Sequence, residues 1–116
     1  MTEPWIDRAT FDNLKEMVGA DFIIELLDTF FEDTPKLVAE MHQALAAVDA
    51  EAFRRAAHSF KSTSASFGAL QLSSLARELE YMGRDGQLEG ANAKLESLEA
   101  AYEQTQIALK VLQNES

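Results

Sequence analysis

Apolar residues recur every three or four positions along almost the whole chain, which is the spacing of one face of an α-helix. The 116 residues include only two prolines and five glycines, and most of these lie between the periodic segments. No segment alternates between apolar and polar residues as a half-buried strand would. The pattern therefore predicts an all-α protein whose helices each bury one apolar stripe.

The periodic segments predict one short helix followed by four longer ones. Thr10 is the expected N-cap of the first helix, and Gly19 is its expected stop. Pro35 interrupts the second segment and removes a backbone donor, so we expect a kink near Thr34 or two abutting helices. The expected helices cover residues 10–18, 21–49, 50–67, a segment between Gly68 and the turn at 83–86, and 89–112.

Short connections between these segments favour antiparallel neighbours. We therefore expect an antiparallel up-and-down four-helix bundle, with the short extra N-terminal helix as a lid. A chain of 116 residues has the usual size of one domain and can bury a real core without metal or disulfide bonds. A single domain over residues 1–116 is the resulting prediction.

The composition excludes several classes of function. A formal net charge of -10 opposes binding to nucleic acid or to an anionic membrane, because both need a basic surface. Cysteine is absent, which excludes disulfides, thiolate metal sites and cysteine catalysis. The N-terminus has no signal-peptide pattern, and no apolar run approaches the roughly 20 residues of a membrane span. We expect a soluble, cytoplasmic monomer.

One segment departs from this acidic composition, and it contains His58. Residues 52–77 include no Asp or Glu. At 100° per residue, the apolar side chains of this segment fall on one face and His58 points away from them. We therefore expect an imidazole that faces solvent, with bases around it and no acid within reach. The bases of this segment are Arg54, Arg55, Lys61 and Arg77.

These surroundings suit a phosphoryl group. The nucleophile would be a neutral ring nitrogen, and adjacent cations favour the neutral imidazole at pH 7. Arg54 and Lys61, each about one turn from His58, could balance the charge of a phosphoryl group. Ser62 and Ala65 are small, so another protein could approach the ring closely. The alternative explanation for the same residues is a solvated helix surface.

Other chemistry finds less support in the sequence. His42 lies at the edge of an apolar stripe and is expected to be a surface or boundary residue. The chain has neither Glu-x-x-His nor HExxH, so no metal site is predicted. It has no glycine-rich phosphate loop either, so ATP binding is not predicted. The hydroxyl-rich run at 59–66 lacks a base with an orienting partner.

The run AHSFKSTSASFGALQLSSLARELE at 57–80 resembles the signature of histidine-containing phosphotransfer (HPt) domains. In that signature a His is followed by a base three positions on, small residues four to eight positions on, a Gly at ten, and a Leu-rich helix. The flanking segments are also similar to this family, so the resemblance covers about residues 11–112. With nothing else attached, the chain resembles the free-standing HPt proteins.

The resemblance implies a four-helix bundle whose exposed His58 is phosphorylated on a ring nitrogen, typically Nε2. The phosphoryl group would come from the receiver domain of a hybrid sensor kinase and pass to the receiver Asp of a response regulator. Lys61 would assist phosphoryl binding, and Glu80 matches a position near the active His. Ser62 stands where the family commonly has Gly, which bears on how tightly a partner can pack there.

The resemblance also implies that the catalytic Asp and a bound Mg²⁺ belong to the partner receiver domain. We therefore expect no cofactor in this chain and no ATP-dependent kinase activity. The expected docking surface is the solvent side of the third helix with the adjoining side of the fourth. Its expected members, which would also surround the phosphate, are Arg54, Arg55, Ser62, Ala65 and Arg77. A non-catalytic helical adaptor that binds a signalling partner through the same surface is the alternative function.

Overall fold

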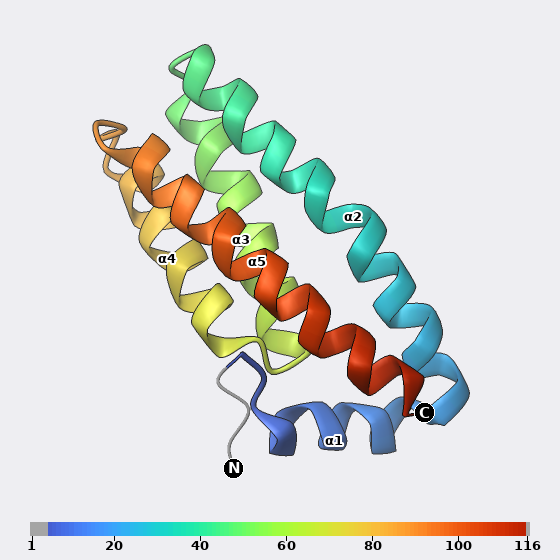
Figure 1. Ribbon diagram of the computed structural model, residues 1–116. Helices are drawn as coiled ribbons and strands as arrows, with labels where there is room; N and C mark the ends of the chain where they lie inside the picture. Colours follow the sequence, from blue (N-terminus) through green and yellow to red (C-terminus); the bar gives the residue numbers. More distant parts are fainter. Residues whose placement is uncertain (1–4, 116) are drawn as a thin grey trace.

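The computed structural model describes residues 5–115, which form five α-helices and no strand (Figure 1). The all-α prediction is confirmed. None of the helices in this described part combines the length and apolar composition needed to cross a membrane. The helices are α1 (Arg8–Val18), α2 (Ala20–Ala46), α3 (Ala50–Ser66), α4 (Leu70–Arg84) and α5 (Ala91–Asn114).

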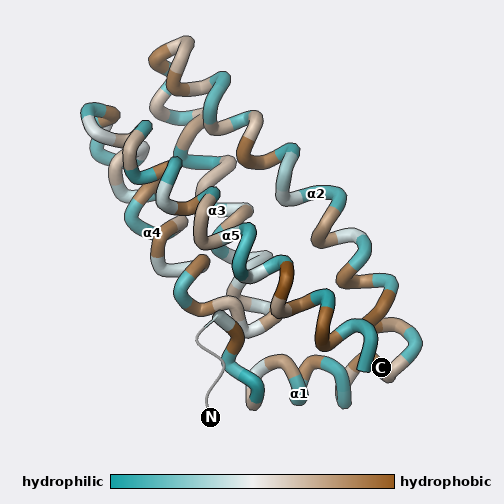
Figure 2. Tube along the Cα trace, in the orientation of Figure 1, coloured by the Kyte–Doolittle hydropathy of each residue, from teal (hydrophilic) through white to brown (hydrophobic). Residues whose placement is uncertain are grey.

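Helices α2 to α5 lie side by side around a shared core. Helix α3 packs against α2 and α4, and α5 packs against the other sides of α4 and α2. Helix α1 lies across one end of these four, where it contacts α2 and α3 (Figure 1). Figure 2 shows hydrophobic and hydrophilic residues alternating along each long helix at short intervals, as an amphipathic helix requires. Burial of the apolar stripes, at about 25 cal/mol per Å², is the main force that holds the helices together.

The aromatic side chains form the centre of this core. Phe30, Phe53 and Phe60 are almost completely buried. The rings of Phe30 and Phe67 meet edge to face with centroids 5.1 Å apart, which joins α2 to the end of α3. Tyr102 of α5 packs beside Phe60, with centroids 6.1 Å apart. These contacts hold the buried face of α3 in place, so its opposite face is presented to solvent.

Asp7 caps the first helix, and the prediction that Thr10 does so is wrong. The Asp7 carboxylate accepts a hydrogen bond from the Thr10 amide at 3.3 Å and a second one from the Thr10 hydroxyl. The helix begins at Arg8, earlier than expected, so Thr10 occupies the third helical position. The predicted end, with Val18 last and Gly19 as the stop, is confirmed.

Helix α2 continues through Pro35 as a single helix, so the alternative of two abutting helices is wrong. Thr34, just before the proline, is fully buried. Its hydroxyl donates to the Phe30 carbonyl at 2.5 Å and lies 2.7 Å from the Tyr102 hydroxyl of α5. A proline inside a helix costs about 3 kcal/mol. Tertiary packing on both sides of the proline outweighs that cost here.

Gly68 forms the turn between α3 and α4 and also holds the segment before α1. Its φ is +83°, and a Cβ there would lie 2.7 Å from the carbonyl oxygen of Asp7. The Gly68 carbonyl accepts a 2.7 Å hydrogen bond from the Asp7 amide. This turn therefore needs glycine both for its backbone conformation and for the close approach of another chain segment.

We expect Gly68→Ala to lower the free energy of unfolding by about 2–4 kcal/mol, since backbone strain adds to a main-chain clash. Urea denaturation measures this loss. Gly86→Ala is the matched control, because Gly86 has a φ of +69° but nothing within 4 Å of an added Cβ. The control should lose only the strain, about 1–2 kcal/mol. Equal losses in the two variants would contradict the clash.

Candidate functional site

His58 lies in the middle of α3, and its side chain is 52% exposed. The residues that flank it on the inner face, Ala57 and Phe60, are completely buried. The expectation that the imidazole faces solvent is therefore confirmed. The helix is held by its apolar face, so the ring stands on a rigid support at the surface.

A carboxylate from the next helix contacts the ring. Nδ1 of His58 lies 2.7 Å from Oε2 of Glu80, which is 22 residues further along the chain in α4. The other oxygen of the same carboxylate, Oε1, lies 2.6 Å from Nζ of Lys61. The expectation that no acid lies within reach of His58 is wrong, because the packing of α4 against α3 supplies one.

The surroundings of Glu80 keep it ionised. Its side chain is only 13% exposed, and this desolvation raises the pKa of the carboxyl. Hydrogen bonds from Lys61 and His58 act in the opposite direction and outweigh it, so the pKa lies below its ordinary value of 4.5. At neutral pH Glu80 is therefore a carboxylate, which contacts His58 through one oxygen and forms an ion pair with Lys61 through the other.

This hydrogen bond determines where the imidazole carries its proton. An ionised carboxylate has no hydrogen to donate, so in the contact with Glu80 the proton must be on Nδ1 of His58. In the neutral ring, the lone pair then belongs to Nε2. The site thus holds a half-exposed imidazole in the tautomer whose Nε2 can act as a nucleophile.

Ser73, which no sequence motif singled out, also contributes to this arrangement. Its hydroxyl donates to the backbone carbonyl of Lys61 at 3.1 Å, so it links α4 to α3 one turn past His58. Ser73 is 7% exposed although it is polar. In the sequence, Ser73 stands beside the leucine stripe of α4. A buried hydroxyl needs a hydrogen-bond partner, so this position could have indicated a polar contact between helices.

The bases around His58 do not all serve the same purpose. Arg54 makes two hydrogen bonds to Glu51, at 2.6 and 3.0 Å, so part of its charge is already paired on its own helix. Glu51 lies just outside the acid-free segment, one turn before Arg54 on the same helix. Arg55 and Arg77 are exposed. Lys61 is the base that the structure brings together with His58 and Glu80.

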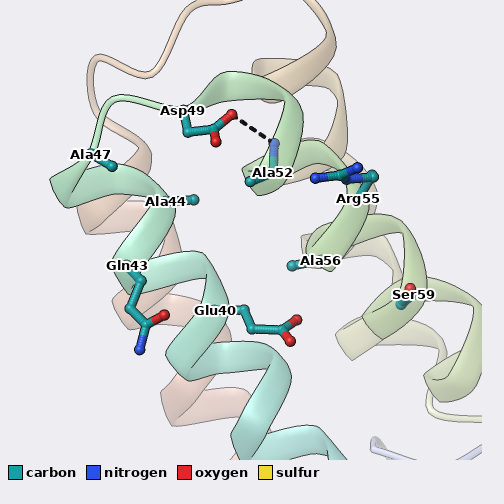
Figure 3. Close-up of a pocket in the computed structure, with 9 residues that line it drawn as sticks. All are labelled: Glu40, Gln43, Ala44, Ala47, Asp49, Ala52, Arg55, Ala56 and Ser59. Carbon is teal, nitrogen blue, oxygen red and sulfur yellow. Dashed lines mark hydrogen bonds between the residues drawn. The ribbon is translucent and has the colours of Figure 1, made fainter.

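Of the small residues expected beside the ring, Ser62 is exposed and Ala65 is half-buried. Arg55 lies on the side of α3 that faces α2. There it lines an open hollow of about 510 Å³ between the two helices, opposite Glu40 (Figure 3). Arg55 therefore lies on the flank of α3 opposite Lys61, which reaches toward α4.

Charge is distributed unevenly over the molecule. Helices α3 and α4 carry five Lys or Arg and three Glu, a net charge of +2. The remaining residues carry five Lys or Arg and 17 Asp or Glu, a net charge of -12, which together make the -10 of the whole chain. The two helices that hold His58 and Glu80 are thus the least acidic part of the protein.

His42 provides a comparison within the same chain. Its side chain is 42% exposed, which agrees with the prediction of a boundary residue. Its Nε2 lies 3.2 Å from Oε2 of Glu99 in α5, a partner that the sequence did not reveal. His42 therefore also faces a glutamate, but through Nε2. In His58 it is Nδ1 that contacts Glu80. Within residues 5–115, no Lys or Arg forms an ion pair with Glu99 as Lys61 does with Glu80.

Comparisons with known proteins identify the family of this chain. A model of the Hpt domain matches residues 25–108, a range that contains His58, Lys61 and Glu80. The crystal structure of histidine-containing phosphotransfer protein B (HptB) from Pseudomonas aeruginosa PAO1 is similar, with a TM-score of 0.91 and 36% sequence identity. That match covers 97% of each chain. The comparison with curated proteins gave no match. The chain therefore belongs to the Hpt domain family, the histidine phosphotransfer proteins of phosphorelays.

Proposed function

We propose that the protein accepts a phosphoryl group on Nε2 of His58 from the receiver domain of a hybrid sensor kinase and passes it to the receiver Asp of a response regulator. The observation that carries this proposal is the 2.7 Å contact between Glu80 and Nδ1 of a half-exposed ring. That contact leaves the lone pair on the outer nitrogen, where a partner can reach it. No ATP takes part, so the protein is a phosphorelay intermediate and not a kinase.

The transfer would proceed without any proton leaving the ring. The Nε2 lone pair attacks the phosphorus of an aspartyl phosphate, an N–P bond forms, and the P–O bond to the aspartate breaks. The partner's aspartate leaves as a carboxylate. The phosphorylated ring keeps its proton on Nδ1 and gains a positive charge, which the carboxylate of Glu80 stabilises. The reverse sequence delivers the group to the next receiver.

Lys61 would stabilise the transferred group. Its ammonium has three hydrogens and forms an ion pair with Glu80 at 2.6 Å. Because Lys61 lies one turn beyond His58, one of these hydrogens can be donated to a phosphoryl oxygen on Nε2. The carboxylate of Glu80 thus positions both the nucleophile and the cation.

The same proposal extends to the scaffold. We propose one HPt domain over residues 1–116, with its core at about 11–112, built as an antiparallel up-and-down four-helix bundle of α2 to α5 with α1 as the extra helix. The contacts of α3 and α5 with both α2 and α4 support this arrangement. The protein would act as a cytoplasmic monomer without a cofactor, nucleic acid or membrane. The reacting Asp and its Mg²⁺ would belong to the partner.

The receiver would dock on the solvent side of α3 and the adjoining side of α4. An aspartyl phosphate is anionic, and these two helices carry a net charge of +2 in a protein of -10. Ser62 and Ala65 beside His58 leave the ring accessible. Arg54, Arg55 and Arg77 would surround the phosphate at the edge of this surface.

Incubation with a panel of phosphorylated receiver domains tests this function. We expect at least one receiver to transfer an acid-labile, base-stable phosphate to the protein, which is the chemistry of phosphohistidine. A receiver that binds the α3–α4 surface while none of the panel transfers phosphate would instead support the helical adaptor.

We expect Lys61→Ala to slow phosphoryl transfer by about tenfold, since one charge-assisted hydrogen bond to the transferred group is lost. Rapid-quench measurement with a radiolabelled receiver gives the rate. The bundle should remain folded, because Lys61 lies outside the hydrophobic core and its side chain is still 24% exposed. Lys94→Ala is the matched control, since Lys94 also pairs with a glutamate of α4, Glu78, at 3.3 Å. Unchanged kinetics in Lys61→Ala would contradict the role of its charge.

A further inference from the structure

Gly83 lies inside α4, one turn beyond Glu80, and it is buried. Its φ is not positive, so the backbone there does not require glycine. Glycine within a helix costs about 1 kcal/mol relative to alanine. A glycine at this position therefore calls for another physical reason, which the contacts of its Cα can provide.

That reason is the close approach of α3. A Cβ at position 83 would lie 2.9 Å from the Cα and the amide nitrogen of Arg54, and 3.0 Å from the carbonyl oxygen of Ala50. All three atoms belong to the main chain of α3, one and two turns before His58. Main-chain atoms inside a helix cannot rotate away as the end of a side chain can. A methyl group at position 83 would therefore push the two helices apart.

Two other small residues of α4, Ser73 and Ala76, are buried, and Ser73 binds the Lys61 carbonyl of α3 at 3.1 Å. Glu80 of α4 lies 2.7 Å from His58 and 2.6 Å from Lys61 of α3. Both distances are near the short end of hydrogen bonding, so they require the two helices to stay close.

We infer that Gly83 is a positioning residue, which sets the separation of α3 and α4 at the site and so keeps Glu80 bonded to His58 and Lys61. Ordinary contact of a methyl carbon begins near 3.5 Å, so an alanine would move the main chains apart by roughly half an ångström. Gly83 is one turn from Glu80, and a helix transmits such a shift as a rigid body. The expected slowing of phosphoryl transfer rests on the proposed function. The expected loss of the contact between Glu80 and the His58 ring does not.

The test is the tautomer of His58 in the unphosphorylated protein, read from ¹⁵N NMR of labelled histidine at about pH 8. In the native protein we expect the proton on Nδ1. In Gly83→Ala we expect this preference to be lost, as in Glu80→Ala, with phosphoryl acceptance about tenfold slower. A Gly83→Ala variant that keeps the native tautomer would overturn the inference.

Gly90→Ala is the control for stability alone. Gly90 has a φ of +81°, so alanine is strained there, but nothing lies within 4 Å of the added Cβ. It precedes α5 and leaves the contact between α3 and α4 unchanged, so the His58 tautomer should remain native. If this control also changes the tautomer, loss of stability alone explains the effect and the inference is wrong.

Circular dichroism shows whether Gly83→Ala is folded, and the NMR measurement is repeated in sucrose, which favours the compact state. A variant that stays unfolded in sucrose would make Gly83 a requirement of the whole fold, which overturns the positioning role. Gly83→Ala could change the tautomer even if the native protein accepts phosphate from no receiver. That result would uphold the role of Gly83 and refute the proposed function.

Discussion

His58→Gln is expected to abolish phosphate incorporation from a phosphorylated receiver, by at least about 10³-fold, because the amide of glutamine has no nucleophilic nitrogen. The fold should persist, since the ring is 52% exposed and contributes little to the core. The loss of the hydrogen bond to Glu80 should lower the free energy of unfolding by only about 1 kcal/mol. Radiolabel transfer and urea denaturation measure the two effects.

His42→Gln is the matched control, because His42 is also partly exposed and also faces a glutamate, at 3.2 Å. It should accept phosphate at the native rate. Label that still enters His58→Gln would refute the assignment of the acceptor. Label that disappears only in His42→Gln would move the acceptor to the other histidine.

Glu80→Ala is expected to slow phosphoryl acceptance by about 10- to 100-fold, because the ring loses the group that holds its proton on Nδ1 and balances its charge during transfer. Glu80→Gln separates these two contributions. A glutamine carbonyl still accepts from Nδ1, so this variant should orient the ring but should not balance the charge. We therefore expect a rate between those of the native protein and Glu80→Ala, measured with the same labelled receiver. Native rates in both variants would show that Glu80 is only structural.

The stability that Glu80 contributes should depend on pH in a defined direction. Its pKa in the folded protein lies below the ordinary value of 4.5, because bonds from Lys61 and His58 outweigh the effect of desolvation. The unfolded chain therefore binds the proton more readily, and stability rises with pH between the two pKa values. The stabilisation is complete at neutral pH and is lost as the pH falls below 4.5 through the folded pKa. The free energies of unfolding of the native protein and of Glu80→Gln can be compared across acidic pH. The difference between them should shrink as the pH falls.

The helices and the exposure of His58 follow from local sequence. An α-helix repeats every 3.6 residues, so the apolar spacing determines which face is buried and which side chains point outward. The stops at Gly19 and Gly68 were likewise readable, because glycine can adopt conformations that end a helix. Local sequence did not decide which of two good capping residues begins the first helix. Asp7 caps α1, although Thr10 is also a good capping residue.

Interactions between helices could not be predicted from local sequence in this way. Pro35 predicts a break in isolation, yet α2 continues, because packing against α3 and α5 outweighs the local cost. Gly83 belongs to a turn signal in the sequence, whereas in the structure it is buried against the main chain of α3. The acid-free segment suggested an imidazole among bases alone, and the resemblance to HPt domains pointed to Glu80 without its distances.

The sequence by itself therefore determined an all-helical chain with one outward-facing histidine beside a lysine, since both properties depend on residues within a few positions of each other. Only the tertiary structure decided that a carboxylate joins them, because Glu80 is 22 residues away and reaches His58 through the close packing of two helices. Hydrogen bonds need a heavy-atom distance near 3 Å, and helical periodicity contains no information about distances between separate helices.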